Sequence, residues 1–148
     1  MCEPMKDARW KQQFQNYRRA FGLLREALED RDIGAYSVLE QEGIIQRFEY
    51  TFELGWKTFR DYLEYSGTSL AEATARSVIK ECAAVGIFKQ AGIDGEMYLE
   101  MMLARNTLSH TYDFERFTGI IAKMKSHYLP ELVKEYDFFV KKEANENG

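Results

Sequence analysis

Large apolar side chains recur every three or four residues along most of the chain, and this spacing predicts amphipathic α-helices. The first such stretch covers residues 8 to 30, where the steps alternate between four and three. Its apolar positions are Trp10, Phe14, Tyr17, Phe21, Leu24 and Leu28. A seam of this kind is typical of a helix packed along another helix. No segment alternates apolar and polar residues with a period of two, so the pattern predicts an all-α fold.

A second helix is predicted from about residue 39 to residue 66, before Gly67, which favours a helix stop. Its apolar stripe consists of Ile45, Phe48, Phe52, Trp56, Phe59 and Leu63. The sequence SLAE, Ser69 to Glu72, then matches a capping box, in which the serine accepts from the backbone and the glutamate reaches back. It predicts the start of a third helix that ends near Gly86.

A fourth helix is predicted over about 95 to 112, with Asp94 as its cap, and a fifth from Phe114, with Asp113 as its cap. Pro130 is expected to kink or restart that helix, because proline lacks an amide proton and crowds the preceding turn. A polar tail from about residue 141 is expected to fray. Residues 1–148 are therefore predicted to form a single domain, an up-and-down antiparallel bundle of about five helices.

The first two seams carry more aromatic surface than one small bundle needs, which indicates a homodimer. With 148 residues, 45% hydrophobic, the chain has the balance of one globular domain. Its net charge of -4 argues against a broad nucleic-acid surface, so any such contact should be confined to a local pocket. We expect a cytoplasmic protein, because the sequence shows no signal peptide and no apolar run near the roughly 18 residues of a membrane span.

Several kinds of site are excluded by the residues present. Cys2 and Cys82 lie far apart without paired histidines, so a zinc site is not expected. The E-x-x-H pairs of di-iron bundles and the glycine-rich phosphate loops are absent, and we expect neither a metal nor a cofactor. Asp30 and Asp32 form a D-x-D pair, but no Gly-Ser turn precedes it, so the chain is not a nucleotidyltransferase on its own.

The stretch ARNTLSHTYD, residues 104 to 113, brings unusual polar groups to the end of the predicted fourth helix. At about 100° per residue, six polar side chains fill an arc of about 160°, opposite Met101, Ala104 and Leu108. The six are Arg105, Asn106, Ser109, His110, Tyr112 and Asp113. They could be a solvated helix end, where a histidine suits the dipole. They could equally hold a phosphodiester and move a proton, with a planar cation, an amide, hydroxyls and an imidazole titrating near neutrality.

Glu49 and Glu53 lie four residues apart on the predicted second helix and share one face, which Lys57 continues. One interpretation is an exposed ion-paired stripe of small energetic value. The other is that one of the two glutamates orients an arginine of the active site.

The sequence RNTLSHTY, Arg105 to Tyr112, matches the R-x-x-x-x-H-x-Y motif of HEPN domains. It resembles in particular the HepT-like toxins, which are paired with minimal nucleotidyltransferases. Three further stretches resemble the nucleotidyltransferase substrate-binding proteins, a branch of the same superfamily: IIQRFEYTFELGWKTFRDYLE (44 to 64), DGEMYLEMMLARNTLSHTYD (94 to 113) and HYLPEL (127 to 132). The resemblance extends from about residue 10 to residue 140.

The resemblance implies a helical bundle that forms a symmetric dimer, with the two motifs facing each other across the interface. It also implies a separately encoded minimal nucleotidyltransferase as the partner. In the substrate-binding branch the bundle would complete a nucleotide or substrate site, and Arg105, Ser109 and Tyr112 are the candidate binding residues. We favour this interpretation.

The alternative is a HepT-like toxin, a metal-independent ribonuclease silenced by AMP addition to the motif tyrosine, here Tyr112. RNA cleavage by the 2'-hydroxyl needs a base and an acid, which His110 and its symmetry mate could supply. Arg105 would neutralise the crowded phosphorane. Asn106 could hold a phosphate oxygen or fix the imidazole. Arg105, Asn106 and His110 are thus the candidate catalytic residues.

Overall fold

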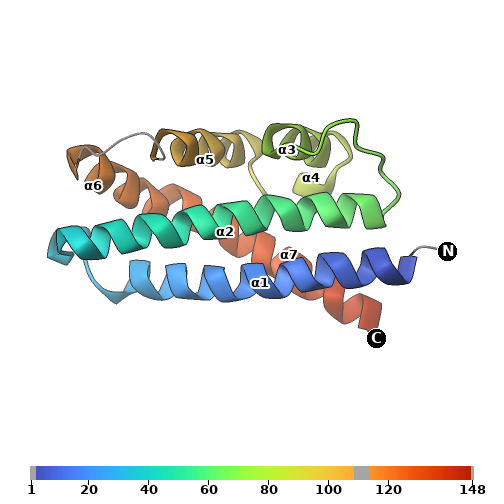
Figure 1. Ribbon diagram of the computed structural model, residues 1–148, viewed down its shortest axis with the longest axis horizontal. Coiled ribbons are helices and arrows are strands. Elements are labelled where there is room, and N and C mark those ends of the chain that lie inside the picture. The colour runs from blue at the N-terminus through green and yellow to red at the C-terminus, as the bar shows by residue number, and fades with distance from the viewer. Residues whose placement is uncertain (1–2, 109–113, 148) are drawn as a thin grey trace.

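The computed structural model describes residues 3–108 and 114–147, and all regular structure in these ranges is helical. The predicted all-α class is therefore confirmed. Two long helices, α1 (Glu3–Asp30) and α2 (Val38–Tyr65), run antiparallel along each other. Figure 1 shows a shorter row of helices above them, with α7 crossing the pair diagonally.

The hairpin between α1 and α2 is closed by a short 3-10 helix, η1 (Ile33–Ala35), and by a capping box at the start of α2. The Ser37 hydroxyl accepts from the Glu40 amide, and the Glu40 carboxylate accepts from the Ser37 amide. Two otherwise unpaired amides are satisfied in this way, which fixes where the second long helix begins.

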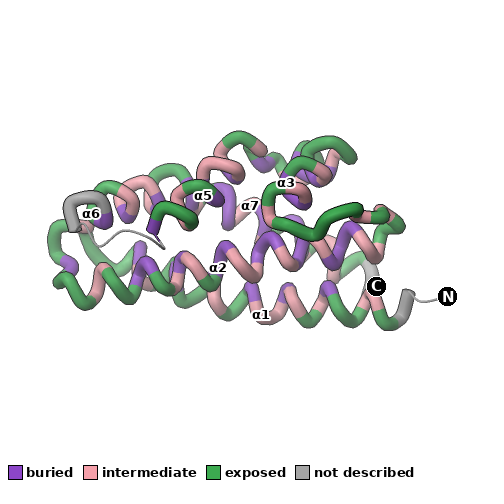
Figure 2. The backbone as a smooth tube through the Cα atoms, turned by 45° about the horizontal axis from the view of Figure 1, so that its top comes forward, coloured by how far each residue is buried: buried purple, intermediate pink, exposed green. Residues whose placement is uncertain are grey.

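The predicted seams of both long helices form the core. All six apolar positions of the first seam and all six of the second are buried, and Figure 2 shows buried positions recurring along both helices. They pack against aromatic residues of α7 (Leu129–Asn147), for example Trp10 and Phe59 against Phe139. The aromatic surface that suggested a homodimer is thus covered within one chain, and the homodimer stays a prediction.

The third helix begins later than predicted. The SLAE capping box is wrong: α3 covers Ala75–Ala84, and its capping box is formed by Thr74 and Ser77. The Ser77 hydroxyl also donates to the backbone carbonyl of Glu72, at 2.6 Å. This bond and the Thr74 cap hold the chain in a turn just where the sequence pattern predicted a helix.

Two left-handed glycines bound a short helix that the sequence did not predict, α4 (Ile87–Ala91). Gly86 has φ 87° and Gly92 has φ 74°, a region that residues with a Cβ avoid. Ile87 and Phe88 are buried, so α4 anchors the turn between α3 and the next helix, α5 (Gly95–Leu108).

The last part of the chain contains α6 (Phe114–Lys123), a π-helical turn η2 (Met124–Tyr128) and α7. Pro130 is the second residue of α7 and directly follows the π-helical turn, so the residue without an amide proton lies where the type of helix changes. The sequence predicted a kink or restart at this position. The polar tail, predicted to fray, is helical to Asn147. None of the described helices combines the length and the apolar character that a membrane span requires.

Candidate functional site

Helix α5 carries the first half of the polar motif on its last turn. It begins after Asp94, whose carboxylate oxygen Oδ1 accepts from the amides of Glu96 and Met97, at 3.0 and 3.3 Å, so the predicted cap is confirmed. Met101 and Leu108 are buried on the opposite side of the helix, as predicted. The packing of this apolar side turns residues 105 and 106 away from the core.

Three neighbours fix the Arg105 side chain. Its Nη1 donates to Oε2 of Glu53 on α2 at 2.6 Å, and its Nε donates to Oδ1 of Asn106 at 3.0 Å. The guanidinium carbon lies 4.9 Å from the centroid of the Phe52 ring, within the range of a cation–π contact. The side chain is only 21% exposed. A planar cation is thus held at the surface in one orientation.

Glu53 is itself held by two more donors on its own helix. Trp56 Nε1 donates to Oε2 at 3.1 Å, and Lys57 Nζ lies 3.3 Å from Oε1. Partial burial raises the pKa of the Glu53 carboxyl, but the hydrogen bonds from Trp56, Arg105 and Lys57 outweigh it, so this pKa lies below its ordinary value. Glu53 is therefore a carboxylate at neutral pH and a stable anchor for Arg105.

Both interpretations of the acidic face on α2 find support in these contacts. Glu53 pairs with Lys57 one turn on, as an exposed stripe would. It also bonds to Arg105, as an orienting residue would. The sequence pattern indicated this acidic face but did not indicate that Phe52 contacts Arg105 or that Trp56 bonds to Glu53. In the sequence, both aromatic residues were recognised only as members of the apolar stripe.

The structure brings Arg105 and Asn106 together, in direct hydrogen-bonding contact. The other motif residues, Ser109, His110, Tyr112 and Asp113, lie outside the described residues. Their position in the site, and with it the predicted polar arc, stays a prediction.

A mainly apolar groove of about 520 Å³ runs between α1 and α2 and has Glu53 on its wall. It therefore lies beside the Arg105 site. Two of its large side chains are well exposed, Leu23 at 49% and Tyr50 at 54%. The remaining lining residues are Asn16, Arg19, Ala20 and Leu54.

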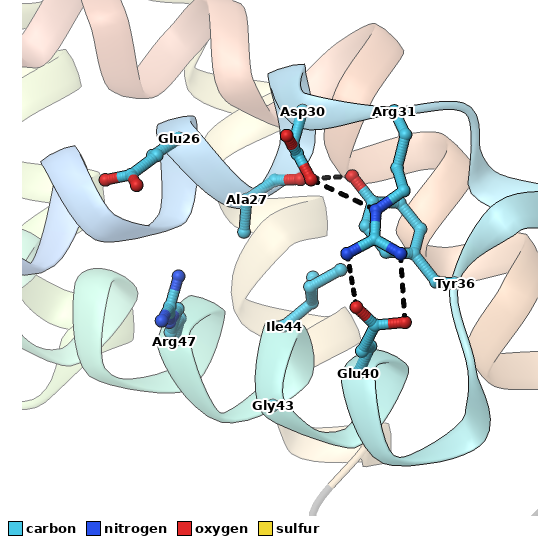
Figure 3. Close-up of a pocket in the computed structure, with 9 residues that line it drawn as sticks. All are labelled: Glu26, Ala27, Asp30, Arg31, Tyr36, Glu40, Gly43, Ile44 and Arg47. Carbon is cyan, nitrogen blue, oxygen red and sulfur yellow. Dashed lines mark hydrogen bonds and ion pairs between the residues drawn. The ribbon is translucent and has the colours of Figure 1, made fainter.

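A second pocket, of about 350 Å³, lies at the loop end of the same hairpin (Figure 3). Its Arg31 is committed to neighbours: Nε donates to Asp30 at 3.0 Å, the two Nη atoms donate to Glu40, and the guanidinium lies over the Tyr36 ring. Asp30 of the D-x-D pair thus serves an ion pair that closes the hairpin. Within the described ranges, no three or more His, Cys, Asp or Glu side chains are grouped so that they could hold a metal ion.

Comparison with known proteins identifies the family of this helical chain. Residues 12–141 match the model of the family described as nucleotidyltransferase substrate binding protein like. The chain belongs to the nucleotidyltransferase substrate-binding protein family. The predicted family is thereby confirmed.

One solved structure similar to this family member is the crystal structure of a protein from Thermus thermophilus. It is 27% identical in sequence and superposes with a TM-score of 0.65. The match covers 85% of this chain and 97% of the Thermus chain. A comparison with curated proteins gives no match.

Proposed function

We propose that the chain is the nucleotide- or substrate-binding subunit of a separately encoded minimal nucleotidyltransferase, with Arg105 at its centre. Membership of the substrate-binding family supports the partnership with a nucleotidyltransferase. The local site would come from the motif residues, with Ser109 and Tyr112 beside Arg105. The protein would supply substrate recognition, and the partner would supply the chemistry.

The observation that carries this proposal is the fixed guanidinium of Arg105. A planar cation with several donors matches a phosphate group, and orientation before binding lowers the entropic cost of recognition. Glu53 and Asn106 each hold one part of the guanidinium, and Phe52 supports it through its ring. An arginine on a solvated helix face needs no such three-sided support.

The test is calorimetric titration of the purified protein, alone and with its nucleotidyltransferase, with a panel of nucleotides. We expect Arg105→Lys to weaken binding at least tenfold, because a lysine cannot reproduce the planar fork. Arg25→Lys is the matched control, since Arg25 is an exposed arginine paired with Glu29 on α1. Equal affinities of the Arg105→Lys variant and the wild type would contradict the proposal.

A second candidate function is the metal-independent ribonuclease of HepT-like toxins. It is favoured by the same oriented arginine, five residues before His110, whose imidazole is a side chain suited to general acid–base catalysis. We would incubate total cellular RNA with the protein in EDTA. Cleavage that is lost in His110→Ala but kept in His127→Ala, the chain's other histidine, would establish this function. Absence of cleavage by folded wild type would leave the binding subunit.

Silencing of such a ribonuclease would involve AMP transfer to Tyr112. The phenolic oxygen would attack the α-phosphorus of ATP on the partner, and pyrophosphate would leave. Incubation with the partner and ATP should then add the mass of one AMP moiety to the wild type and none to Tyr112→Phe. An unchanged mass of the wild type would contradict this modification.

We also propose a homodimer that uses the groove between α1 and α2. The support is its exposed apolar pair, Leu23 and Tyr50, next to the Arg105 site. Sedimentation should show a dimer for the wild type and a monomer for Leu23→Glu. The control is Val85→Glu, a similarly exposed apolar position after α3. A monomeric wild type, or a dimer in Leu23→Glu, would contradict this arrangement.

A further inference from the structure

Glu135, in the middle of α7, is a charged residue type placed in the centre of the core. Its exposure is 0%. Oε1 accepts a hydrogen bond from the Tyr98 hydroxyl of α5 at 2.6 Å. Oε2 has no hydrogen-bond partner among the described residues. A buried carboxylate normally has a cation or several donors as partners, because its desolvation is costly.

Within the described part of the chain, the groups named here around Glu135 provide no positive charge. Tyr17 of α1, Cys82 of α3 and Tyr98 of α5 all feel its charge, and α2 approaches with Gly55. Tyr17 donates its proton elsewhere, to the backbone carbonyl of Leu132 at 2.7 Å.

On α7 itself, Glu131 and Asp137 are acidic, and the nearest lysine along the helix, Lys134, bonds to Glu131. Ionised Glu135 would therefore lie among acids, phenols and a thiol. The surroundings stabilise the neutral form of its side chain.

Gly55 shows that α2 is shaped around this cluster. A Cβ at this position would lie 2.9 Å from the Tyr98 hydroxyl oxygen, 3.0 Å from Glu135 Oε1 and 3.1 Å from Cε1 of Tyr17. Gly43, on the same helix, would have nothing within 4 Å of an added Cβ. Glycine in a helix interior lowers stability by about 0.5–1 kcal/mol relative to alanine. At residue 55 the absence of a side chain leaves space for the hydrogen bond between Tyr98 of α5 and Glu135 of α7.

Burial raises the pKa of the Glu135 carboxyl to about 8, although the hydrogen bond from Tyr98 lowers it. The side chain is therefore a carboxylic acid through most of the physiological range. In this form it satisfies Tyr98 without leaving an unpaired charge in the core.

We propose that Glu135 acts as an uncharged carboxylic acid that latches α5, and with it Arg105, onto α2 and α7. Tyr98 and Arg105 are seven residues apart, two turns along one helix, so the bond at Tyr98 fixes the register in which Arg105 meets Glu53. Glu135 is thus a positioning residue. The latch rests on the core geometry, and only its effect on ligand binding rests on the proposed function of Arg105.

The pH dependence of unfolding tests the latch directly. The folded state binds the proton of Glu135 more tightly than the unfolded chain, in which this carboxyl has a pKa near 4.5. The contribution of the protonated side chain to stability is therefore fully present below about pH 4.5 and is lost as pH rises towards 8. The ratio of the unfolding constants of wild type and Glu135→Gln should grow by up to about tenfold per pH unit across this window. Glutamine keeps the acceptor for Tyr98 but cannot ionise.

Glu131→Gln is the matched control, one turn earlier on α7. Glu131 is also buried, but its carboxylate accepts from the Asp94 amide and from Lys134. This variant should keep the wild-type slope between pH 5 and 8. A constant ratio between wild type and Glu135→Gln across the window would overturn the proposal, because Glu135 would then titrate alike in the folded and unfolded states.

Hydrogen exchange locates the effect in the fold. In the wild type, protection factors of α5 amides should fall between pH 6 and 8.5 more than those of α1 amides, and in Glu135→Gln the two helices should change in parallel. Parallel changes in the wild type would overturn the latch on α5. Neither readout requires a ligand, so a failure of nucleotide binding leaves both results interpretable. With a nucleotide that binds, affinity should fall with pH in wild type and less in Glu135→Gln.

Discussion

Two glutamates hold α5, one on its exposed side and one on its buried side, and their surroundings are opposite. Glu53 lies at the surface and receives hydrogen bonds from Trp56, Lys57 and Arg105. Glu135 lies in the core and receives one, from Tyr98. The pKa of the first carboxyl is lowered and that of the second is raised to about 8. The same side chain is therefore a charged anchor in one place and an uncharged one in the other.

The comparison shows that the donors around a carboxyl, and its access to water, decide its role. Each N–H donor near Glu53 stabilises the anion, and solvent moderates the attraction. Around Glu135 the largest effect is desolvation, which penalises the anion. Substitutions at the buried contact should hence change stability strongly, and substitutions at the surface contact should change ligand binding more than stability.

The largest effect is expected for Gly55→Ala, which breaks the buried contact. The new Cβ would overlap the Tyr98 hydroxyl and Glu135 Oε1, and overpacking of this kind costs about 1–3 kcal/mol. Gly43→Ala is the control on the same helix, where the free space should allow a gain of up to about 1 kcal/mol from helix propensity. Urea denaturation of both variants measures the difference. A stabilising Gly55→Ala would mean that the cluster has room to relax.

A loss of comparable size is expected for Tyr98→Phe, which removes the donor but keeps the ring. Glu135 then loses its hydrogen bond in the core, at a cost of about 1–3 kcal/mol. Tyr128→Phe is the control, since its hydroxyl bonds to the partly exposed Glu100, and this variant should lose less stability. A double-mutant cycle with Glu135→Gln gives the coupling energy, and additive effects would show that the two side chains act independently.

At the surface contact, Glu53→Gln should reduce stability by less than about 1 kcal/mol, because the pair is partly exposed. The pKa of Glu53 is lowered in the folded state, so its contribution is present above about pH 4.5 and is lost as pH falls through the folded-state pKa. The melting temperatures of wild type and variant, measured between pH 3 and 7, should thus become more alike as the pH falls. Convergence towards alkali instead would contradict the assignment of a carboxylate.

The smallest change is expected for Lys57→Gln, which removes the ion pair one turn from Glu53. Pairs of this spacing contribute about 0.3–0.5 kcal/mol. The bond between Glu53 and Arg105 should remain, so nucleotide affinity should stay within a factor of two or three of wild type, about 0.5 kcal/mol. A loss as large as that of Arg105→Lys would show that Lys57 itself contacts the ligand.

The sequence was most informative where one periodic signal decided the structure. The apolar seams predicted both long helices and all twelve of their core positions, because burial follows the helical period directly. The start of the third helix was wrong, since Ser69 and Thr74 each begin a plausible capping pattern. Only the packed structure shows that Ser77 bonds to Thr74 and to the Glu72 carbonyl.

The site was predictable in its residue types and less so in its contacts. Arg105 was identified from its motif, but Glu49 and Glu53 share a helix face, so the sequence could not choose between them as its partner. Glu135 was not singled out, although its position carried a signal. Leu132, Phe138 and Phe139 lie three or four residues away and place it on the apolar face of α7. A glutamate is ordinarily exposed, and the contacts with Gly55 and Tyr98 show how the core accommodates this one.

The reactivity of the Cys82 thiol, near Glu135, can report how often this core opens. Cys82 is 0% exposed, and burial raises the pKa of its thiol well above the ordinary value. Because the thiolate is the reactive form, the folded protein should resist alkylation. In a Cys2→Ser chain, the rate at which iodoacetamide modifies the remaining cysteine would therefore count how often α3 lifts away from the bundle.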